Sequence, residues 1–257
     1  MPGPGASLPE VNERSERASA VWVPLTLVAC LALAFFAWDS VALLPLKLLA
    51  VMAHETGHAL ASLLVGGSVN QVTLRPNESG SCLSQIPVGF LGKVAVSSGG
   101  YVGNALISAV LLVLTIRFRA GRPLAIAAAA WLGLVALLYA RDLFTLGFAA
   151  GFAVVFGLAA RLLPQTGLQV LNLFLATFNS VYAARDLFDD LWNGQVRSQS
   201  DAQILADGTG VPALAWAAAW TALALLVLAV GARAAFGGAA KVRSAAASGA
   251  PRSPAAP

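Results

Sequence analysis

Charged residues are scarce in this chain of 257 residues, where Asp, Glu, Lys and Arg together make up 11%. A water-soluble domain usually carries about 25% charged residues, and apolar residues here reach 58%. The deficit is too large for a water-soluble surface, so we expect a polytopic membrane domain with short tails. The basic residues are scattered through loops and do not cluster with aromatics, which argues against a nucleic-acid partner.

Cysteine and histidine are also rare. The two cysteines, Cys30 and Cys82, exclude a disulfide framework, and His54 and His58 are the only histidines. A cleavable signal peptide is not expected, because the first apolar run is longer than a signal core of about 7–15 residues. We therefore interpret that run as a retained helix.

Long apolar runs dominate the rest of the sequence. A helix needs roughly 20 mainly apolar residues to cross a bilayer, which predicts an all-α polytopic membrane protein with about 6–7 transmembrane helices. The candidate segments are 21–38, 41–65, 96–116, 123–140, 143–163, 167–192 and 212–236. This organisation gives a disordered tail at 1–20, one membrane-embedded domain at 21–236 and a second disordered tail at 237–257.

Residues 68–90 differ from these runs. They follow Gly66-Gly67, a plausible helix stop, and alternate Val69, Val72 and Leu74 before a Pro76-Asn77 turn signal. The pattern predicts a small β-hairpin at the membrane surface after the second helix. An irregular loop fits the same pattern equally well.

The middle of the second apolar run contains His54-Glu55-Thr56-Gly57-His58. Helix residues four apart lie on one face, so both imidazoles can reach one zinc ion. Zinc activates a water molecule, and Glu55 is placed to take its proton during attack on a peptide carbonyl. Ionisable groups at membrane depth indicate function by default. The structural alternative is a polar helix contact made by the two histidines and Glu55.

A catalytic zinc site normally has three protein ligands and one open position. Because no third histidine exists, the third ligand should be a carboxylate. Asp39 lies roughly 20 Å from the motif along a helix axis, and Asp142 stands at an expected helix end.

The sixth run offers better candidates in one polar stripe, formed by Asn179, Tyr182, Asp186 and Asp190. We favour Asp186 as third ligand because it is deeper in the run, with Asp190 as alternate ligand or as an outer partner of the ligands. The alternative is that the run ends at Arg185 and leaves both acids in solvent.

Two other segments carry polar residues. Small residues at 97–104 predict a packing surface against the histidine helix, with Gly57 as the matching small position. Asn104 is a candidate substrate-binding residue, or else a plain interhelix hydrogen-bond donor. In the loop near 193–211, Ser200 or Asp201 is expected to cap a short helix, and no chemistry is assigned to it.

With its metal motif inside a membrane helix, the chain resembles the site-2 protease family of intramembrane zinc metalloproteases, and most closely the compact bacterial B-like branch. The matching features are His54, Glu55 and His58, the β segment, the Gly99-Gly100 start of the next helix and an acidic later helix. The resemblance implies one Zn²⁺, a buried site, hydrolysis of membrane protein substrates and a bacterial cell membrane.

That family also takes its third ligand from a later helix, usually in an Asn…Leu-Asp-Gly motif. Here Asn179 and Asp186 are similarly spaced, but the local order is Arg185-Asp186-Leu187. The resemblance further implies that an edge of the β segment receives an extended substrate.

The leading hypothesis is therefore a multi-pass zinc metalloendopeptidase whose partners are membrane protein substrates and the lipid bilayer. The alternative is a non-proteolytic membrane protein, either a metal or proton-coupled transporter or an inactive relative that only binds clients.

Overall fold

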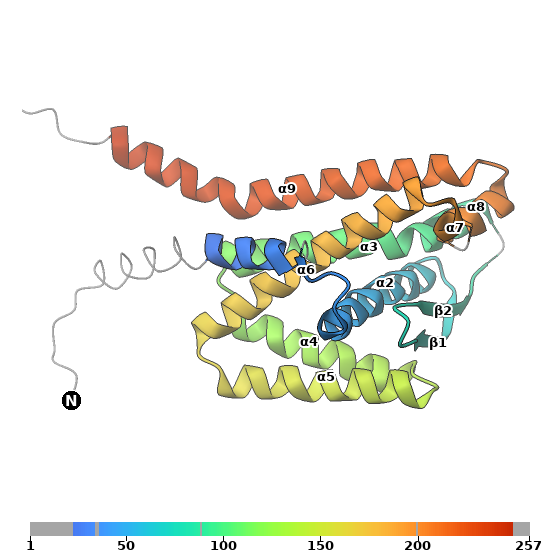
Figure 1. Ribbon diagram of the computed structural model, residues 1–257, viewed down its shortest axis with the longest axis horizontal. Coiled ribbons are helices and arrows are strands. Elements are labelled where there is room, and N and C mark those ends of the chain that lie inside the picture. Colours follow the sequence, from blue (N-terminus) through green and yellow to red (C-terminus); the bar gives the residue numbers. More distant parts are fainter. Residues whose placement is uncertain (1–22, 34–35, 88, 199, 249–257) are drawn as a thin grey trace, which may run out of the picture.

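The computed structural model describes the backbone of residues 23–33, 36–87, 89–198 and 200–248. Side chains are described up to residue 237. The predicted tail at 1–20 therefore lies outside the described residues, as do residues 249–257. The helices run over Val23–Leu33, Val41–Leu43 (η1, a 3-10 turn), Leu44–Leu64 (α2), Phe90–Ile116 (α3), Gly121–Leu138 (α4), Leu143–Leu162 (α5), Gln165–Trp192 (α6), Gly194–Arg197 (α7), Asp201–Thr209 (α8) and Ala213–Ser248 (α9) (Figure 1).

Four helices in the described part are long and apolar enough to cross a membrane, namely α3, α4, α5 and the Ala213–Gly237 part of α9. The mostly helical membrane fold is thus confirmed. The predicted second and sixth spans correspond to α2 and α6, which are of similar length but carry more buried polar residues. These two helices lie inside the bundle with α3, while α4 and α5 form a pair on one side and α9 runs along the other (Figure 1).

Glycines bring α2 and α3 unusually close together. A Cβ atom added to Gly57 would overlap the carbonyl group of Gly99, and one added to Gly99 would overlap the carbonyl oxygen of Gly57. Small residues allow such backbone contact between membrane helices. The predicted packing surface between the two helices is confirmed.

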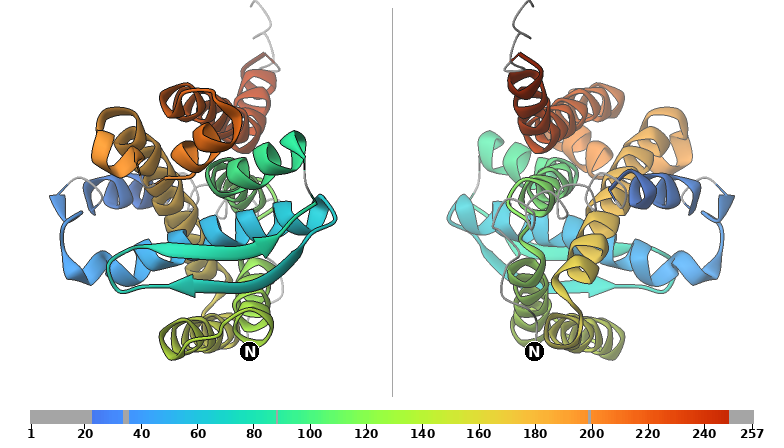
Figure 2. Two further views of the ribbon diagram at one scale, coloured as in Figure 1. Left: turned by 90° about the vertical axis from the view of Figure 1, so that its right-hand side faces the viewer. Right: turned by 90° about the vertical axis from the view of Figure 1, so that its left-hand side faces the viewer.

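The predicted hairpin is also confirmed. Strands β1 (Ser68–Leu74) and β2 (Gly80–Gln85) pair antiparallel with one irregularity between Val69 and Gln71, and Figure 2 shows them running alongside α2. The outer edge of β1 is partly occupied, because the backbone N–H of Val72 donates to the carbonyl oxygen of Tyr139. The Leu74 N–H donates to the Thr145 hydroxyl.

The ends of the later helices follow local chemistry. Asp142 separates α4 from α5 as an N-cap, since its side chain accepts a hydrogen bond from the Thr145 N–H. α6 continues past Arg185 to Trp192, so the alternative that placed Asp186 and Asp190 in a solvated loop is wrong. α9 extends to Ser248, well into the segment that composition alone assigned to a disordered tail.

Candidate metal centre

The two histidines meet on one face of α2. Their Nε2 atoms lie 3.0 Å apart, and both rings are buried. The space for this meeting exists because residue 100 of the facing helix α3 is glycine: an added Cβ there would overlap the Nε2 atoms of both His54 and His58. The glycine therefore leaves a small space in front of the Nε2 atoms of His54 and His58, and we call this space the cradle.

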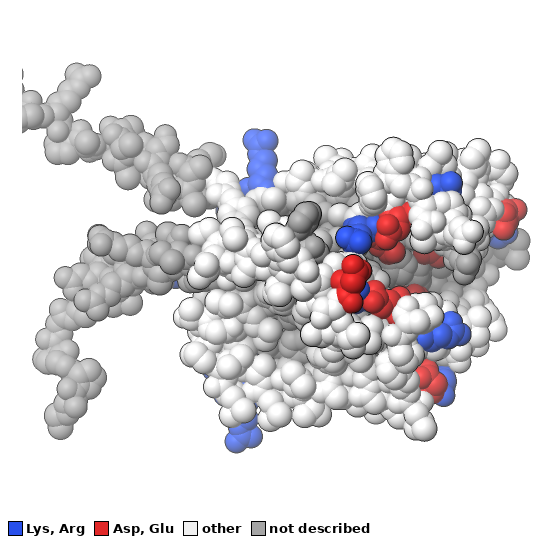
Figure 3. All heavy atoms as spheres, in the orientation of Figure 1, with Lys and Arg blue, Asp and Glu red and all other residues white. Residues whose placement is uncertain are grey.

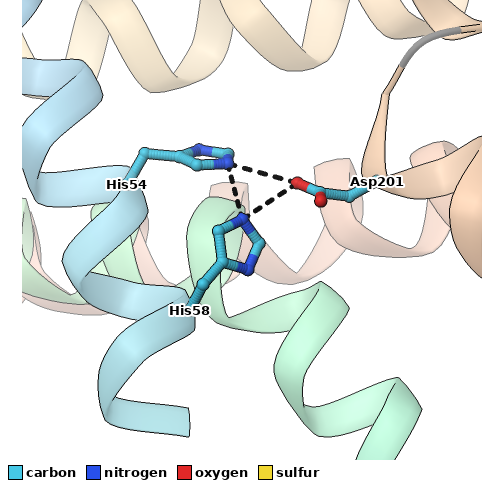
Figure 4. Close-up of side chains that lie close together, drawn as sticks. All are labelled: His54, His58 and Asp201. Atoms are coloured by element: carbon cyan, nitrogen blue, oxygen red, sulfur yellow. Dashed lines mark hydrogen bonds and ion pairs between the residues drawn. The ribbon is translucent and has the colours of Figure 1, made fainter. Parts of the chain in front are cut away.

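A third donor reaches this cradle from the short helix α8. Oδ2 of Asp201 lies 3.2 Å from Nε2 of His54 and 3.1 Å from Nε2 of His58 (Figure 4). α8 is anchored beside the site by two fully buried apolar residues, Ala202 and Leu205. They pack into a cluster that also contains Tyr101 of α3 and residues of α6 and α9.

These three donors fit a zinc ion in type and spacing. Two imidazole nitrogens and one carboxylate oxygen form a donor set used by catalytic zinc, which leaves one position open. Ligands at 2.0–2.1 Å from a tetrahedral centre are separated by about 3.3 Å, and the three donor atoms here are 3.0–3.2 Å apart. Among the described residues, they are the only group of three or more His, Cys, Asp or Glu side chains with donor atoms this close together.

The opposite nitrogens of the two rings face oxygen acceptors. Nδ1 of His58 lies 2.7 Å from the carbonyl oxygen of Val96, and Nδ1 of His54 lies 3.7 Å from Oδ2 of Asp186. An acceptor at Nδ1 favours the tautomer that keeps its proton there and leaves the Nε2 lone pair for a metal. The Val96 carbonyl therefore orients the His58 ring for coordination through Nε2. The Asp186 carboxylate faces the corresponding nitrogen of His54 from beyond hydrogen-bond distance.

Tyr101 supports the His54 ring from the side. The two rings meet edge to face at 4.7 Å between centroids, and the Tyr101 hydroxyl donates to Oδ2 of Asp190 at 2.7 Å. Asp190 is buried, so this hydrogen bond fixes the tyrosine against the histidine. Asp190 therefore contacts His54 through Tyr101, while the Asp186 carboxylate lies 3.7 Å from Nδ1 of the same ring.

Asp201 is held in its charged form. Without a bound metal, burial raises the pKa of its carboxyl, but the charge of protonated His58 and hydrogen bonds from both imidazoles outweigh this and lower the pKa well below its usual range. The ionised carboxylate is the form that binds a cation.

The three donors lie in a polar cleft of about 930 Å³ between α2, α6, α8 and the hairpin. Glu55 also faces this cleft, as do Gly80, Ser81 and Cys82 of β2. Figure 3 shows acidic side chains gathered around a hollow on this face of the protein. A polypeptide entering the cleft would therefore meet the three donors, a carboxylate beside them and the backbone of β2.

The predicted site residues are brought together to different degrees. His54, Glu55 and His58 share the cleft, and Asp186 and Asp190 line it together with Tyr182, as expected from their common stripe on α6. Asp186 is not within reach of both Nε2 atoms; it faces the far nitrogen of His54. The third donor that does meet both Nε2 atoms, Asp201, was not predicted as a ligand.

Asn104 occupies a different environment from the one expected of a substrate-binding residue. Its side chain accepts a hydrogen bond from the Asn179 amide at 2.7 Å and donates to the carbonyl oxygen of Ala50 at 3.4 Å. It is 1% exposed and is not part of the cleft wall. These contacts correspond to the plain interhelix hydrogen bond considered for it.

The only sequence signal near Asp201 was its expected place in a short helix after the sixth run. That helix exists as α8, with Ser200 at the N-cap position. The Ser200 hydroxyl donates to the carbonyl oxygen of Arg197 and accepts no capping hydrogen bond from the N–H groups of the helix. The Ala202 and Leu205 pair, three residues apart, is the feature that indicates a buried face and hence a docked helix.

The sequence over residues 27–231 matches the family described as Peptidase M50B-like. The chain belongs to this family. The match confirms the resemblance to site-2 proteases and identifies the chain as an integral membrane protein of a peptidase family. Comparison with curated proteins and with solved structures gave no match.

Proposed function

We propose that this member of the M50B-like family is an intramembrane zinc endopeptidase acting on membrane protein substrates. The observation that carries the proposal is the convergence of His54, His58 and Asp201 on one point beside Glu55. In this proposal these three residues hold one zinc ion and Glu55 is the general base. Asp201 takes the role first assigned to Asp186, and the Asp186 carboxylate supplies a negative charge 3.7 Å from Nδ1 of His54.

Zinc bound there would polarise the scissile carbonyl and lower the pKa of the attacking water. Glu55 directly follows His54 in the sequence and faces the same cleft. Its carboxylate takes the proton from the attacking water and delivers it to the leaving amine. Asp186 and Tyr101 keep the His54 ring fixed through these steps, which lowers the reorganisation needed during the reaction.

The substrate is expected to bind as an extended strand along β2. β1 lies between β2 and the α4–α5 turn, so the outer edge of β2 is the one that faces the cleft. A strand edge offers N–H and C=O groups that can hold a peptide through main-chain hydrogen bonds. An extended backbone also exposes its carbonyl to attack, whereas a helical backbone does not.

Zinc content and cleavage test the proposal together. Wild type and His54→Ala are purified in detergent and analysed for metal, with about one zinc per chain expected in wild type and a loss in the variant. Equal zinc in both proteins, or none in either, rejects the metal site.

Cleavage of fluorescently labelled casein, an unfolded polypeptide, is then compared between wild type and Glu55→Gln. We expect a loss of about 10²–10⁴-fold with zinc retained. Metal without turnover in wild type would favour the client-binding relative. Ion flux into proteoliposomes that survives Glu55→Gln would favour the transporter.

A further inference from the structure

Lys47 is a buried cation on the same helix as the histidines. Its residue is 4% exposed, its Nζ lies 2.9 Å from Oε1 of Glu78, and it stands 4.9 Å from the centre of the Trp38 ring. Lysine is almost never fully buried unless it is paired. A solvent-exposed ion pair contributes little to stability. In this pair the lysine side chain is only 5% exposed, although that of the glutamate is 37% exposed, and removing the partner of a buried charge is destabilising.

Its partner Glu78 occupies the turn between β1 and β2 in a conformation that few side chains adopt. The φ angle of Glu78 is 65°, in the left-handed region that favours glycine or asparagine. The turn is closed by the hydrogen bond from the Arg75 N–H to the Ser79 carbonyl oxygen. The ion pair that the Glu78 side chain forms with Lys47 explains why glutamate occupies this position.

The hairpin is fastened to α2 near both of its ends. Near the base, the hydroxyl groups of Ser62 of α2 and Ser84 of β2 are joined by a hydrogen bond of 2.8 Å. At the turn, the connection is the ion pair between Lys47 and Glu78. Gly80, the first residue of β2, lies between these two attachments. It packs against the proposed general base, because a Cβ added to Gly80 would come within 2.6 Å of Oε1 of Glu55.

We propose that the ion pair between Lys47 and Glu78 is a positioning device that holds the hairpin turn on α2 and so keeps the edge of β2 beside Glu55 to receive the substrate. The inference rests on the proposed function for its catalytic consequence. Its structural part, the fastening of the turn, does not depend on zinc or on cleavage.

The inference assigns no chemical step to either residue. The pair acts on binding: a loosened turn lets β2 leave the cleft wall, so fewer substrate molecules are held as a paired strand. A loss of uniform binding raises KM and leaves kcat at saturation largely unchanged. This separates the pair from Glu55, whose loss lowers kcat.

The test compares Lys47→Met and Glu78→Gln with wild type, in the full-length protein. Lys47→Arg is the conservative rescue, and Arg75→Gln is the matched control, because it removes an exposed charge from the same turn. Four quantities are measured: hydrogen exchange of the backbone amides in 75–82 (Pro76 has none), zinc content, and KM and kcat for labelled casein.

For Lys47→Met and Glu78→Gln we expect faster exchange at 75–82, unchanged zinc and a KM raised about tenfold or more. Lys47→Arg and Arg75→Gln should behave as wild type. Unchanged exchange at 75–82 in both test variants overturns the inference, and so does faster exchange with unaltered KM. Parallel loss of zinc also overturns it, since the pair would then support the metal site.

If wild type holds no zinc and cleaves nothing, the proposed function fails, and hydrogen exchange alone then decides the inference. Faster exchange at 75–82 in the variants would still establish the fastening of the turn. Unchanged exchange would reject it.

Discussion

Oδ2 of Asp201 lies 3.2 Å from Nε2 of His54, although 147 residues separate them in the chain. The contact depends on two docked helices, α2 in the bundle interior and α8 beside it. The carboxylate that meets the histidines therefore comes from a short helix between α7 and α9 and not from the long acidic helix α6.

The first prediction separates the two aspartates. Asp201→Ala should lose zinc almost completely, because it removes a donor from a three-ligand site. Asp186→Asn should keep zinc but bind it about 10–100-fold more weakly, since it removes the negative charge that lies 3.7 Å from Nδ1 of His54. Both affinities can be measured by competition with a chromophoric chelator.

Asp207→Asn is the control for this comparison, because Asp207 is an exposed acid on the same helix as Asp201. Its zinc affinity should equal that of wild type. Stronger loss in Asp186→Asn than in Asp201→Ala would return the role of third ligand to Asp186.

The second prediction concerns Gly100, which is not a ligand. Gly100→Ala should weaken zinc binding about tenfold or more, because the new methyl group occupies the space in front of both Nε2 atoms. Titration of the metal-free protein with zinc measures the effect. Gly133→Ala is the control, since a Cβ there meets open space and alanine suits a helix better than glycine by about 0.5–1 kcal/mol. Equal affinity in all three proteins would contradict the cradle.

The third prediction is an asymmetry between the partners of the ion pair. The Lys47 side chain is 5% exposed and that of Glu78 is 37% exposed. Glu78→Gln leaves the buried charge of Lys47 with only a neutral acceptor. Because Glu78 itself is partly exposed, the loss of stability should fall below the roughly 3–5 kcal/mol of a fully buried pair. Lys47→Met leaves a glutamate that water can still reach, so its cost should be smaller.

Reversible unfolding in mixed detergent micelles measures both free energies. Equal losses, or a larger loss in Lys47→Met, would contradict the assignment of Lys47 as the buried partner. The measurement needs no zinc and no substrate.

The fourth prediction uses Cys82, which lies on β2 in the cleft wall. Burial and the negative charges of Glu55 and Asp201 raise the pKa of its thiol to about 12. Because the thiolate is the reactive form, a raised pKa means slower alkylation at neutral pH. In a Cys30→Ser background, iodoacetamide should react at pH 8 far more slowly than with a free cysteine, and the rate should rise about tenfold per pH unit up to pH 10. Mass spectrometry of the modified peptide gives the rates, and a rate at pH 8 like that of free cysteine would contradict this environment.

Local patterns in the sequence were sufficient for much of the fold. The paired histidines, the hairpin after the second helix and the extension of α6 past Arg185 all follow from periodicity or turn chemistry within a few residues. The close contact at Gly57 and Gly99 followed from the need of membrane helices for small residues where backbones touch.

Features that depend on distant contacts were not predictable in this way. Asp201 has no spacing relation to His54, and only the docking of α8 brings them together. Asn104 could have faced the cleft or a neighbouring helix, and the position of Asn179 on α6 decides this in favour of the helix. The helical extension of α9 has a simpler cause, because the alanines, Lys241 and Arg243 beyond the apolar part are strong helix formers.

The position of Asp201 late in the chain has a consequence for biosynthesis. The ribosome makes the histidines of α2 long before it makes α8, because synthesis runs from the N-terminus. Until α8 has emerged and docked through Ala202 and Leu205, the nascent chain presents two imidazoles without their carboxylate. A peptidase made in this order lacks one of its three candidate metal donors until α8 has been synthesised and has docked.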